Sequence, residues 1–150
     1  MAIADRLKEL GITLPPPPPP AGLYVPCVQA GDLLVISGQI PRQPEARGKL
    51  GKDVTIEQAQ EWARHCAINA LGIAADHLGS LDRVVRVVRL AGYVASAEGF
   101  TDHPKVINGA SQLMLDVFGE AGKHARIALG VAELPMGAPV EVEFMFQVKG

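Results

Sequence analysis

Two runs near the end of the chain alternate between bulky apolar residues and smaller or polar ones with a period of two. The first covers residues 124–132 and the second covers residues 140–147. Successive side chains of a strand point to opposite faces of a sheet, so this period predicts two β-strands. We expect the bulky face of each strand to lie on the hydrophobic core, which places Arg126 and Glu141 together on the opposite face. The bulky positions are Ile127, Leu129, Val131, Val140, Val142, Phe144 and Phe146.

The N-terminal residues show a different pattern, a short helix followed by a run of prolines. Apolar residues spaced three or four apart predict one face of a helix over residues 3–10, and Gly11 is a typical helix end. The prolines of Pro15–Pro20 cannot donate backbone hydrogen bonds and favour a polyproline II conformation. Such a run is either a ligand of an SH3-like domain or a stiff spacer, and the lack of flanking basic residues favours the spacer. We therefore predict a helix and spacer over residues 1–21 and one domain over residues 22–150.

The domain begins with a pattern that is typical of a β-hairpin. Leu23–Gln29 and Leu33–Ser37 are apolar runs typical of strands, and the Gly-Asp pair between them is a two-residue turn signal. We expect the core of the domain to begin at Leu23. A long polar loop is expected over Gly38–Asp53, after the second of these strands.

Two segments in the middle of the chain predict helices, with a valine-rich strand between them. Thr55 and Gln58 have the spacing of a capping box at the start of the first helix, which we expect to end at Gly79. Val84–Val94 is apolar on both faces and predicts a central strand. The second helix is expected over residues 102–118. The first helix has a stripe of small residues that allows close packing on a sheet, namely Ala59, Ala63, Cys66, Ala67, Ala70 and Ala74.

The predicted order of elements in the domain is β-β-α-β-α-β-β. This order defines an α+β fold with one layer of two helices on a mixed sheet. The link over Glu133–Pro139 contains two prolines, which argues against a tight hairpin between the last two strands. The second face of the sheet has no helices to cover it, so we predict that the chain forms a homotrimer through this face.

Composition narrows the classes of function and the compartment. A net charge of −2 over 150 residues gives no basic surface for nucleic acid. No apolar run approaches the roughly 18–20 residues that a membrane span needs. Cys27 and Cys66 lack a C-x-x-C spacing, and the N-terminus shows no signal peptide, so we expect a reduced, cytoplasmic protein. The four histidines lack metal-ligand spacing, and no metal site is predicted.

Several short motifs, taken in their order and spacing, resemble the YjgF/RidA family. They are Tyr24-Val25, S-G-Q-I-P at Ser37–Pro41, Asn108, Ala125-Arg126 and V-E-V-E at Val140–Glu143. The resemblance extends over residues 24–148, and the N-terminal helix and prolines are additional, so the chain resembles a longer branch of the family. It implies a trimer with a chorismate-mutase-like fold, whose last strand inserts beside the central strands. It also implies hydrolysis of reactive enamines and imines to 2-keto acids and ammonia, in clefts between subunits.

The resemblance also implies roles for particular residues. Arg126 matches the arginine that binds the substrate carboxylate, and Glu141 matches the glutamate associated with the hydrolytic water. Three further residues, Tyr24, Gly38 and Asn108, match positions in the pocket wall. Ala128 also falls in the pocket, at a position where many members of the family have cysteine. This last departure raises the possibility of a different substrate or of a loss of activity.

The chemistry of these residues supports the same reaction. An arginine fork can bind a planar carboxylate with two parallel hydrogen bonds, and a carboxylate such as Glu141 can orient water toward a reactive imine. This reaction needs no metal or organic cofactor. Other interpretations stay open: Arg126 as a structural ion pair between subunits, Glu141 as an ordinary polar residue on an alternating strand, Tyr24 as an interface or core aromatic, and Asn108 as a bridge to a neighbouring segment.

Three classes of function remain after this reading. The first is a hydrolase of 2-imino and 2-enamino acids, and the second is a non-catalytic trimer that binds small carboxylates. The third is a ribonuclease, an activity attributed to some members of the family. The acidic balance of the chain and the lack of a histidine pair count against the ribonuclease.

Overall fold

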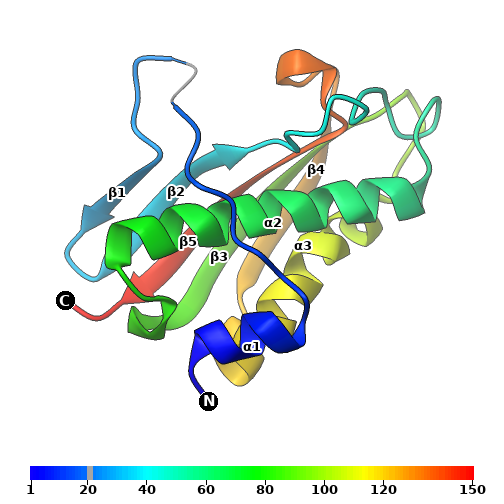
Figure 1. The fold of residues 1–150 in the computed structure, drawn as a ribbon. Helices are drawn as coiled ribbons and strands as arrows, with labels where there is room; N and C mark the ends of the chain where they lie inside the picture. Colours follow the sequence, from blue (N-terminus) through cyan, green and yellow to red (C-terminus); the bar gives the residue numbers. More distant parts are fainter. Residues whose placement is uncertain (20–21) are drawn as a thin grey trace.

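The computed structural model describes residues 1–19 and 22–150, and it confirms the predicted α+β class. A five-stranded mixed sheet carries its two long helices on one face (Figure 1). The strands are β1 (Cys27–Ala30), β2 (Leu33–Gln39), β3 (Val84–Ala95), β4 (Ala125–Val131) and β5 (Val140–Val148). The α-helices are α1 (Ile3–Glu9), α2 (Ile56–Leu78) and α3 (His103–Phe118), and three short 3-10 helices are η1 (Leu81–Arg83), η2 (Gly119–Gly122) and η3 (Pro135–Gly137).

The last strand lies in the middle of the sheet, next to β3. The strand order is β1-β2-β5-β3-β4, so β5 is separated from its predecessor β4 by β3. β5 runs antiparallel to both β2 and β3, whereas β3 and β4 are parallel. This topology confirms the insertion that the family resemblance implied, and it explains why the link before β5 has no hairpin turn.

The long helix α2 begins and ends as its sequence predicts. The Thr55 hydroxyl accepts from the backbone N–H of Gln58 (3.1 Å), and the Gln58 side chain accepts from the backbone N–H of Thr55 (2.9 Å). These two bonds form the capping box. Gly79 ends the helix with a φ of 81°, in the left-handed region that favours glycine. All six small residues of the predicted stripe are buried, and the helix therefore lies close to the sheet.

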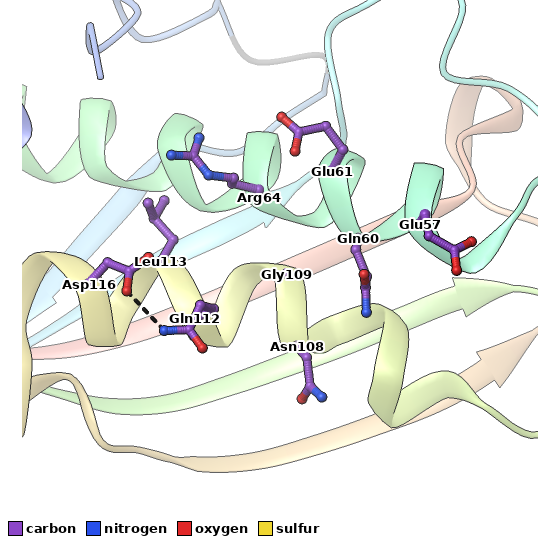
Figure 2. Close-up of a pocket in the computed structure, with 9 residues that line it drawn as sticks. All are labelled: Glu57, Gln60, Glu61, Arg64, Asn108, Gly109, Gln112, Leu113 and Asp116. Carbon is purple, nitrogen blue, oxygen red and sulfur yellow. Dashed lines mark hydrogen bonds between the residues drawn. The ribbon is translucent and has the colours of Figure 1, made fainter. Parts of the chain in front are cut away.

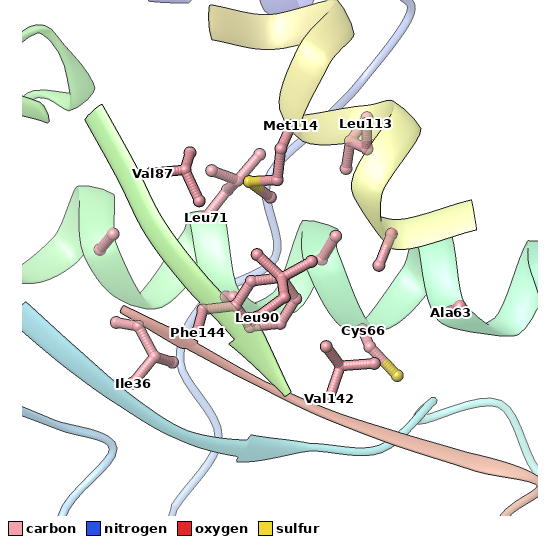
Figure 3. Close-up of a cluster of buried hydrophobic side chains, with 14 of the residues drawn as sticks. Ile36, Ala63, Cys66, Leu71, Val87, Leu90, Leu113, Met114, Val142 and Phe144 are labelled. Atoms are coloured by element: carbon pink, nitrogen blue, oxygen red, sulfur yellow. The ribbon is translucent and has the colours of Figure 1, made fainter. Parts of the chain in front are cut away.

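The hydrophobic core fills the space between the sheet and the helix layer (Figure 3). Phe144 and Phe146 of β5 are the largest fully buried side chains. Leu71 of α2 and Met114 of α3 lie on the helix side of Phe144, and Leu90 of β3 is its neighbour in the sheet. The alternation predicted for β5 is therefore confirmed, with Val140, Val142, Phe144 and Phe146 on the core face.

The prediction for β4 is wrong, because its small residues rather than its bulky ones face the helices. Leu90 pairs with both Phe144 and Arg126, so these three residues share the helix-covered face of the sheet. Ile127 points to the uncovered face and is 44% exposed. The reason is that α3 lies close over β4: a Cβ on Gly130 would collide with the His103 side chain.

The orientation of β4 separates two residues that were expected to lie together. Tyr93 of β3 pairs with both Glu141 and Leu129, which places these residues on the uncovered face of the sheet. Arg126 projects from the other face. The expectation that Arg126 and Glu141 share one face of the same sheet is therefore wrong, because the bulky side of β4 does not mark the core of the single chain.

The N-terminal segment is also more closely packed than the sequence suggested. Leu7 of α1 is buried in the core cluster, and Ile12 and Leu14 pack against it. Leu23, in contrast, is fully exposed, and the first strand begins only at Cys27. The expectation that the core begins at Leu23 is therefore wrong. Pro20, the last residue of the proline run, and Ala21 lie outside the described residues.

The uncovered face of the sheet exposes large apolar side chains. Val28 is 55% exposed, Val35 is 39% exposed, and Ile127 lies on the same face. An apolar surface of this kind on a sheet is typical of an interface between subunits. In the part of the chain that the structure describes, no helix combines the length and hydropathy needed to cross a bilayer.

Candidate functional site

Glu141 lies in a cavity of about 320 Å³ near the start of β5. Gly38 of β2 lines the same cavity and contacts the glutamate directly: a Cβ on Gly38 would lie 2.5 Å from Oε2 of Glu141. Tyr24, which precedes β1, forms another part of the wall. The structure therefore brings together three of the predicted site residues, and Gly38 provides the space that the Glu141 carboxylate occupies.

The surroundings of Glu141 favour its protonated form. Burial raises the pKa of the Glu141 carboxyl above its ordinary value, and the charge of nearby Glu143 raises this pKa further. The Tyr93 hydroxyl donates a hydrogen bond to Glu143, whereas no hydrogen bond from the described residues reaches the Glu141 carboxylate. A carboxyl group with a raised pKa, free to bond a water or a ligand, has the properties of a general acid or base.

Residues outside the predicted motifs form the rest of the cavity wall. Pro18 and Pro19 of the N-terminal run line it, as do Met136 of η3 and Arg42 of the loop after β2. Met136 has a φ of 62°, in the left-handed region that a non-glycine residue rarely adopts. Sequence reasoning missed these residues because three separate segments bring them to Glu141. Arg42 alone had a sequence signal, since it directly follows the S-G-Q-I-P motif.

Arg126 lies at a second location, where β4 faces α3. Its guanidinium donates to Oδ1 of Asn108 (2.8 Å) and to the hydroxyl of Ser111 (3.1 Å). Its other terminal nitrogen donates to the backbone carbonyl of Pro104 (3.4 Å). Asn108 therefore bridges α3 to a neighbouring strand, as one of the sequence interpretations proposed. Ala128, two residues along β4, packs against the core beneath α3.

The predicted site is thus divided into two parts within one chain. We call Glu141, Gly38 and Tyr24 the glutamate cluster, and Arg126 with Asn108 the arginine cluster. Glu141 of the glutamate cluster lies on the uncovered face of the sheet. Arg126 of the arginine cluster lies on the helix-covered face, on the edge strand β4. Arg126 makes no ion pair with the described residues, and its guanidinium remains exposed.

Comparison with known proteins shows what this fold is similar to. Residues 4–147 match the family described as "YjgF/chorismate mutase-like, putative endoribonuclease". The chain belongs to the YjgF/RidA family. It is 45% identical to Protein TCP17 of Trypanosoma cruzi, over 97% of this chain and 94% of that protein.

Solved structures of similar proteins show the same fold. The Agrobacterium tumefaciens protein Atu1372, described as having unknown function, is 42% identical, with a TM-score of 0.89 over 98% of this chain and 92% of the other. RidA from an Antarctic Psychrobacter species is 26% identical, with a TM-score of 0.61 over 88% of this chain and 94% of the other.

A second cavity of this protein lies between α2 and α3, on the outer side of the helix layer (Figure 2). It measures about 370 Å³, and most of its lining is polar, including the acidic Glu57 and Asp116 and the basic Arg64. Of the predicted site residues only Asn108 borders it, and the Asn108 carbonyl accepts from Arg126 instead. This cavity is therefore separate from the glutamate cluster.

Each histidine of this protein contacts another polar side chain, and Cys66 is a buried thiol. His65 contacts Gln43, His77 contacts Gln29, and His103 contacts Ser96. His124 bonds Ser111, the same hydroxyl that accepts from Arg126. Burial strongly raises the pKa of the Cys66 thiol, which keeps it protonated and unreactive. Within residues 1–19 and 22–150, no group of three or more metal-ligating side chains comes together.

Proposed function

We propose that this protein hydrolyses reactive 2-imino and 2-enamino acids to 2-keto acids and ammonia. The observation that carries the proposal is the half-buried Glu141 carboxyl, with its raised pKa, lying against Gly38 in a cavity. The raised pKa allows one group to accept a proton from water and then return it to the nitrogen. Membership of the YjgF/RidA family, which includes RidA among its solved structures, supports the proposal.

The reaction needs only positioned water and proton transfer. An enamine first takes up a proton on carbon and becomes the protonated imine. Glu141 then accepts a proton from water as the water oxygen attacks the imine carbon, which forms a carbon that bears both hydroxyl and amino groups. The proton passes from Glu141 to the nitrogen, the carbon–nitrogen bond breaks, and ammonia leaves. The hydroxyl releases its proton to solvent as it becomes the keto oxygen, which balances the proton taken up at the start. The sum is imino acid plus water to keto acid plus ammonia.

The substrate carboxylate requires a cation, and we propose that Arg126 of a neighbouring subunit supplies it. Arg126 and Asn108 lie apart from Glu141 within one chain, so the complete site is assembled from the glutamate cluster of one subunit and the arginine cluster of the next. The exposed apolar side chains on the uncovered face of the sheet support association of subunits. We propose a homotrimer, because three such chains form a closed ring with three equivalent sites.

This arrangement also accounts for the bonds that Arg126 makes. Asn108 and Ser111 each accept from the same nitrogen of the guanidinium, and neither acceptor carries a negative charge. The positive charge of Arg126 is therefore held in place without being neutralised by a carboxylate. A guanidinium oriented in this way is prepared to bind a substrate carboxylate.

Ammonia release from freshly generated 2-aminoacrylate tests the proposed reaction. The wild type is expected to accelerate ammonia release beyond the uncatalysed rate, and Glu141→Gln is expected to lose about 100- to 10,000-fold in kcat, the usual contribution of a general acid or base. Glu133→Gln is the matched control, since Glu133 is an exposed glutamate that pairs with Lys49 (2.7 Å) and lies outside the cavity lining. Binding of 2-keto acids without ammonia release would show a carboxylate-binding protein instead, and RNA cleavage that persists through purification would show a ribonuclease.

A further inference from the structure

The N-terminal residues 12–19 form a strap that crosses the outer side of α2 and continues to the Glu141 cavity (Figure 1). The Pro15 carbonyl lies against Gly72 of α2, where a Cβ would be only 2.5 Å from its oxygen. The carbonyl of Pro16 accepts a hydrogen bond from Arg42 (2.9 Å). The strap then supplies Pro18 and Pro19 to the cavity wall.

The strap is fixed at its N-terminal end and in its middle. Before it, α1 is anchored by the buried Leu7, and its Arg6 donates to the carbonyl of Asp116 on α3 (2.7 Å). Prolines restrict the backbone further because their rings fix φ. Arg42 and Gly72 hold the middle of the strap. Pro18 and Pro19 are therefore a positioned part of the wall.

The cavity that the strap completes is larger and more apolar than a three-carbon substrate requires. Its volume of about 320 Å³ falls within the range of roughly 300–1,000 Å³ that ligand pockets usually have. Glu141, Arg42 and Gln39 are the polar parts of the wall apart from the Tyr24 hydroxyl. The rest is formed by Gly38, by proline rings and by the Met136, Ile40 and Tyr24 side chains. The imine related to 2-aminoacrylate carries only a methyl group, which leaves most of these apolar surfaces without a contact.

We infer that the strap makes this protein selective for 2-imino acids with apolar side chains of about four carbons, an inference that rests on the proposed function. Gly72 and Arg42 act as positioning residues through their contacts with the backbone of the strap. When two substrates differ by one methylene group in an apolar pocket that fits the larger one, their kcat/KM values differ by about 10-fold or more. We therefore expect the imine of leucine to exceed the imine of alanine by at least about 10-fold in kcat/KM.

Gly72→Ala tests this inference in the full chain. The added methyl group displaces the strap because it meets a backbone oxygen, while alanine inside a helix is more favourable than glycine, so the fold is retained. Arg42→Ala removes the second attachment. Arg47→Ala is the matched control: it lies in the same loop, but its guanidinium donates to the carbonyl of Ala46 rather than to the strap.

The substrates are imines generated in place from alanine, leucine and glutamate by an amino acid oxidase or dehydrogenase. In both strap variants the leucine-to-alanine ratio of kcat/KM is expected to fall by about 10-fold, while Arg47→Ala keeps the wild-type ratio. Gly72 lies outside the cavity lining, so Gly72→Ala is also expected to retain the rate with the imine of alanine. An unchanged ratio in Gly72→Ala and Arg42→Ala overturns the inference. A wild-type preference for the imine of glutamate also overturns it, since Arg42 would then be a ligand for a second carboxylate.

Binding of 2-keto acids separates this inference from the proposed reaction. Calorimetry with pyruvate and 4-methyl-2-oxopentanoate measures selectivity without any turnover. If no imine is hydrolysed but Gly72→Ala still lowers the preference for 4-methyl-2-oxopentanoate, the proposed reaction fails and the role of the strap stands. If imines are hydrolysed and neither measure of selectivity changes in the variant, the reaction stands and the role of the strap fails.

Discussion

Replacing Gly38 by alanine tests whether the position of the Glu141 carboxylate determines activity. The new Cβ would lie 2.5 Å from Oε2 of Glu141, whereas ordinary van der Waals contact begins at 3.4 Å. The carboxylate must therefore move by about 1 Å, because its neighbour is fixed in a strand. A displacement of this size in a reacting group typically lowers the rate by about 100-fold. We expect kcat for ammonia release to fall by about this factor, while circular dichroism shows a folded protein.

The origin of the effect can be isolated by two further measurements. In a Glu141→Gln background, Gly38→Ala is expected to have little additional effect on kcat, since both changes act on one group. The pKa of Glu141, followed by NMR, is expected to move toward its ordinary value, because the displaced carboxylate is less buried. A Gly38→Ala protein with wild-type kcat and an unchanged Glu141 pKa would refute the reasoning.

Three other changes have defined outcomes. Arg126→Ala is expected to weaken 2-keto acid binding by about 10- to 1,000-fold, and Arg126→Lys to restore only part of this affinity, which calorimetry measures; wild-type affinity in an intact Arg126→Ala oligomer would exclude the carboxylate role. Glu141→Gln is expected to raise the melting temperature at neutral pH, because the raised pKa means that the folded state disfavours the ionised carboxyl. The stability that protonated Glu141 gives is complete below the ordinary carboxyl range and is lost as pH rises through the raised pKa. The difference in melting temperature between Glu141→Gln and the wild type should therefore vanish in acid. A difference that persists in acid would show that ionisation of Glu141 is not its cause. Leu7→Ala is expected to cost about 2–3 kcal/mol and to lower the melting temperature by roughly 5–10 °C, since Leu7 is buried in the core; an unchanged melting temperature would show that α1 is not integral.

The fold was predictable wherever local sequence signals and burial agree. The capping box of Thr55 and Gln58, the helix end at Gly79 and the core face of β5 all follow from short patterns, and the structure confirms each of them. The prediction for β4 was wrong because the period-two alternation defines two faces of the strand but does not determine which face the helices cover. Its small residues face α3, which lies close, and its bulky residues lie on the face that we propose is covered by another subunit.

The candidate site was predictable as a set of residues and not as an arrangement. Glu141, Gly38 and Tyr24 were named by the family resemblance, and they do line one cavity. The strap and Met136 were missed because they reach Glu141 only through the folding of distant segments. Arg126 was expected beside Glu141, whereas the register of β4 places it on the other face of the sheet.

Mixing two inactive variants tests the central claim, that the site is built from two subunits. Glu141→Gln lacks the acid–base group and retains Arg126, whereas Arg126→Ala retains Glu141. In trimers assembled at random from equal amounts of both, one site in four combines an intact Glu141 with an intact Arg126 of the neighbour. After unfolding and refolding the two variants together, with light scattering to establish the trimeric mass, we expect ammonia release to return to about a quarter of the wild-type rate. Trimers that mix but recover no activity would contradict the shared site.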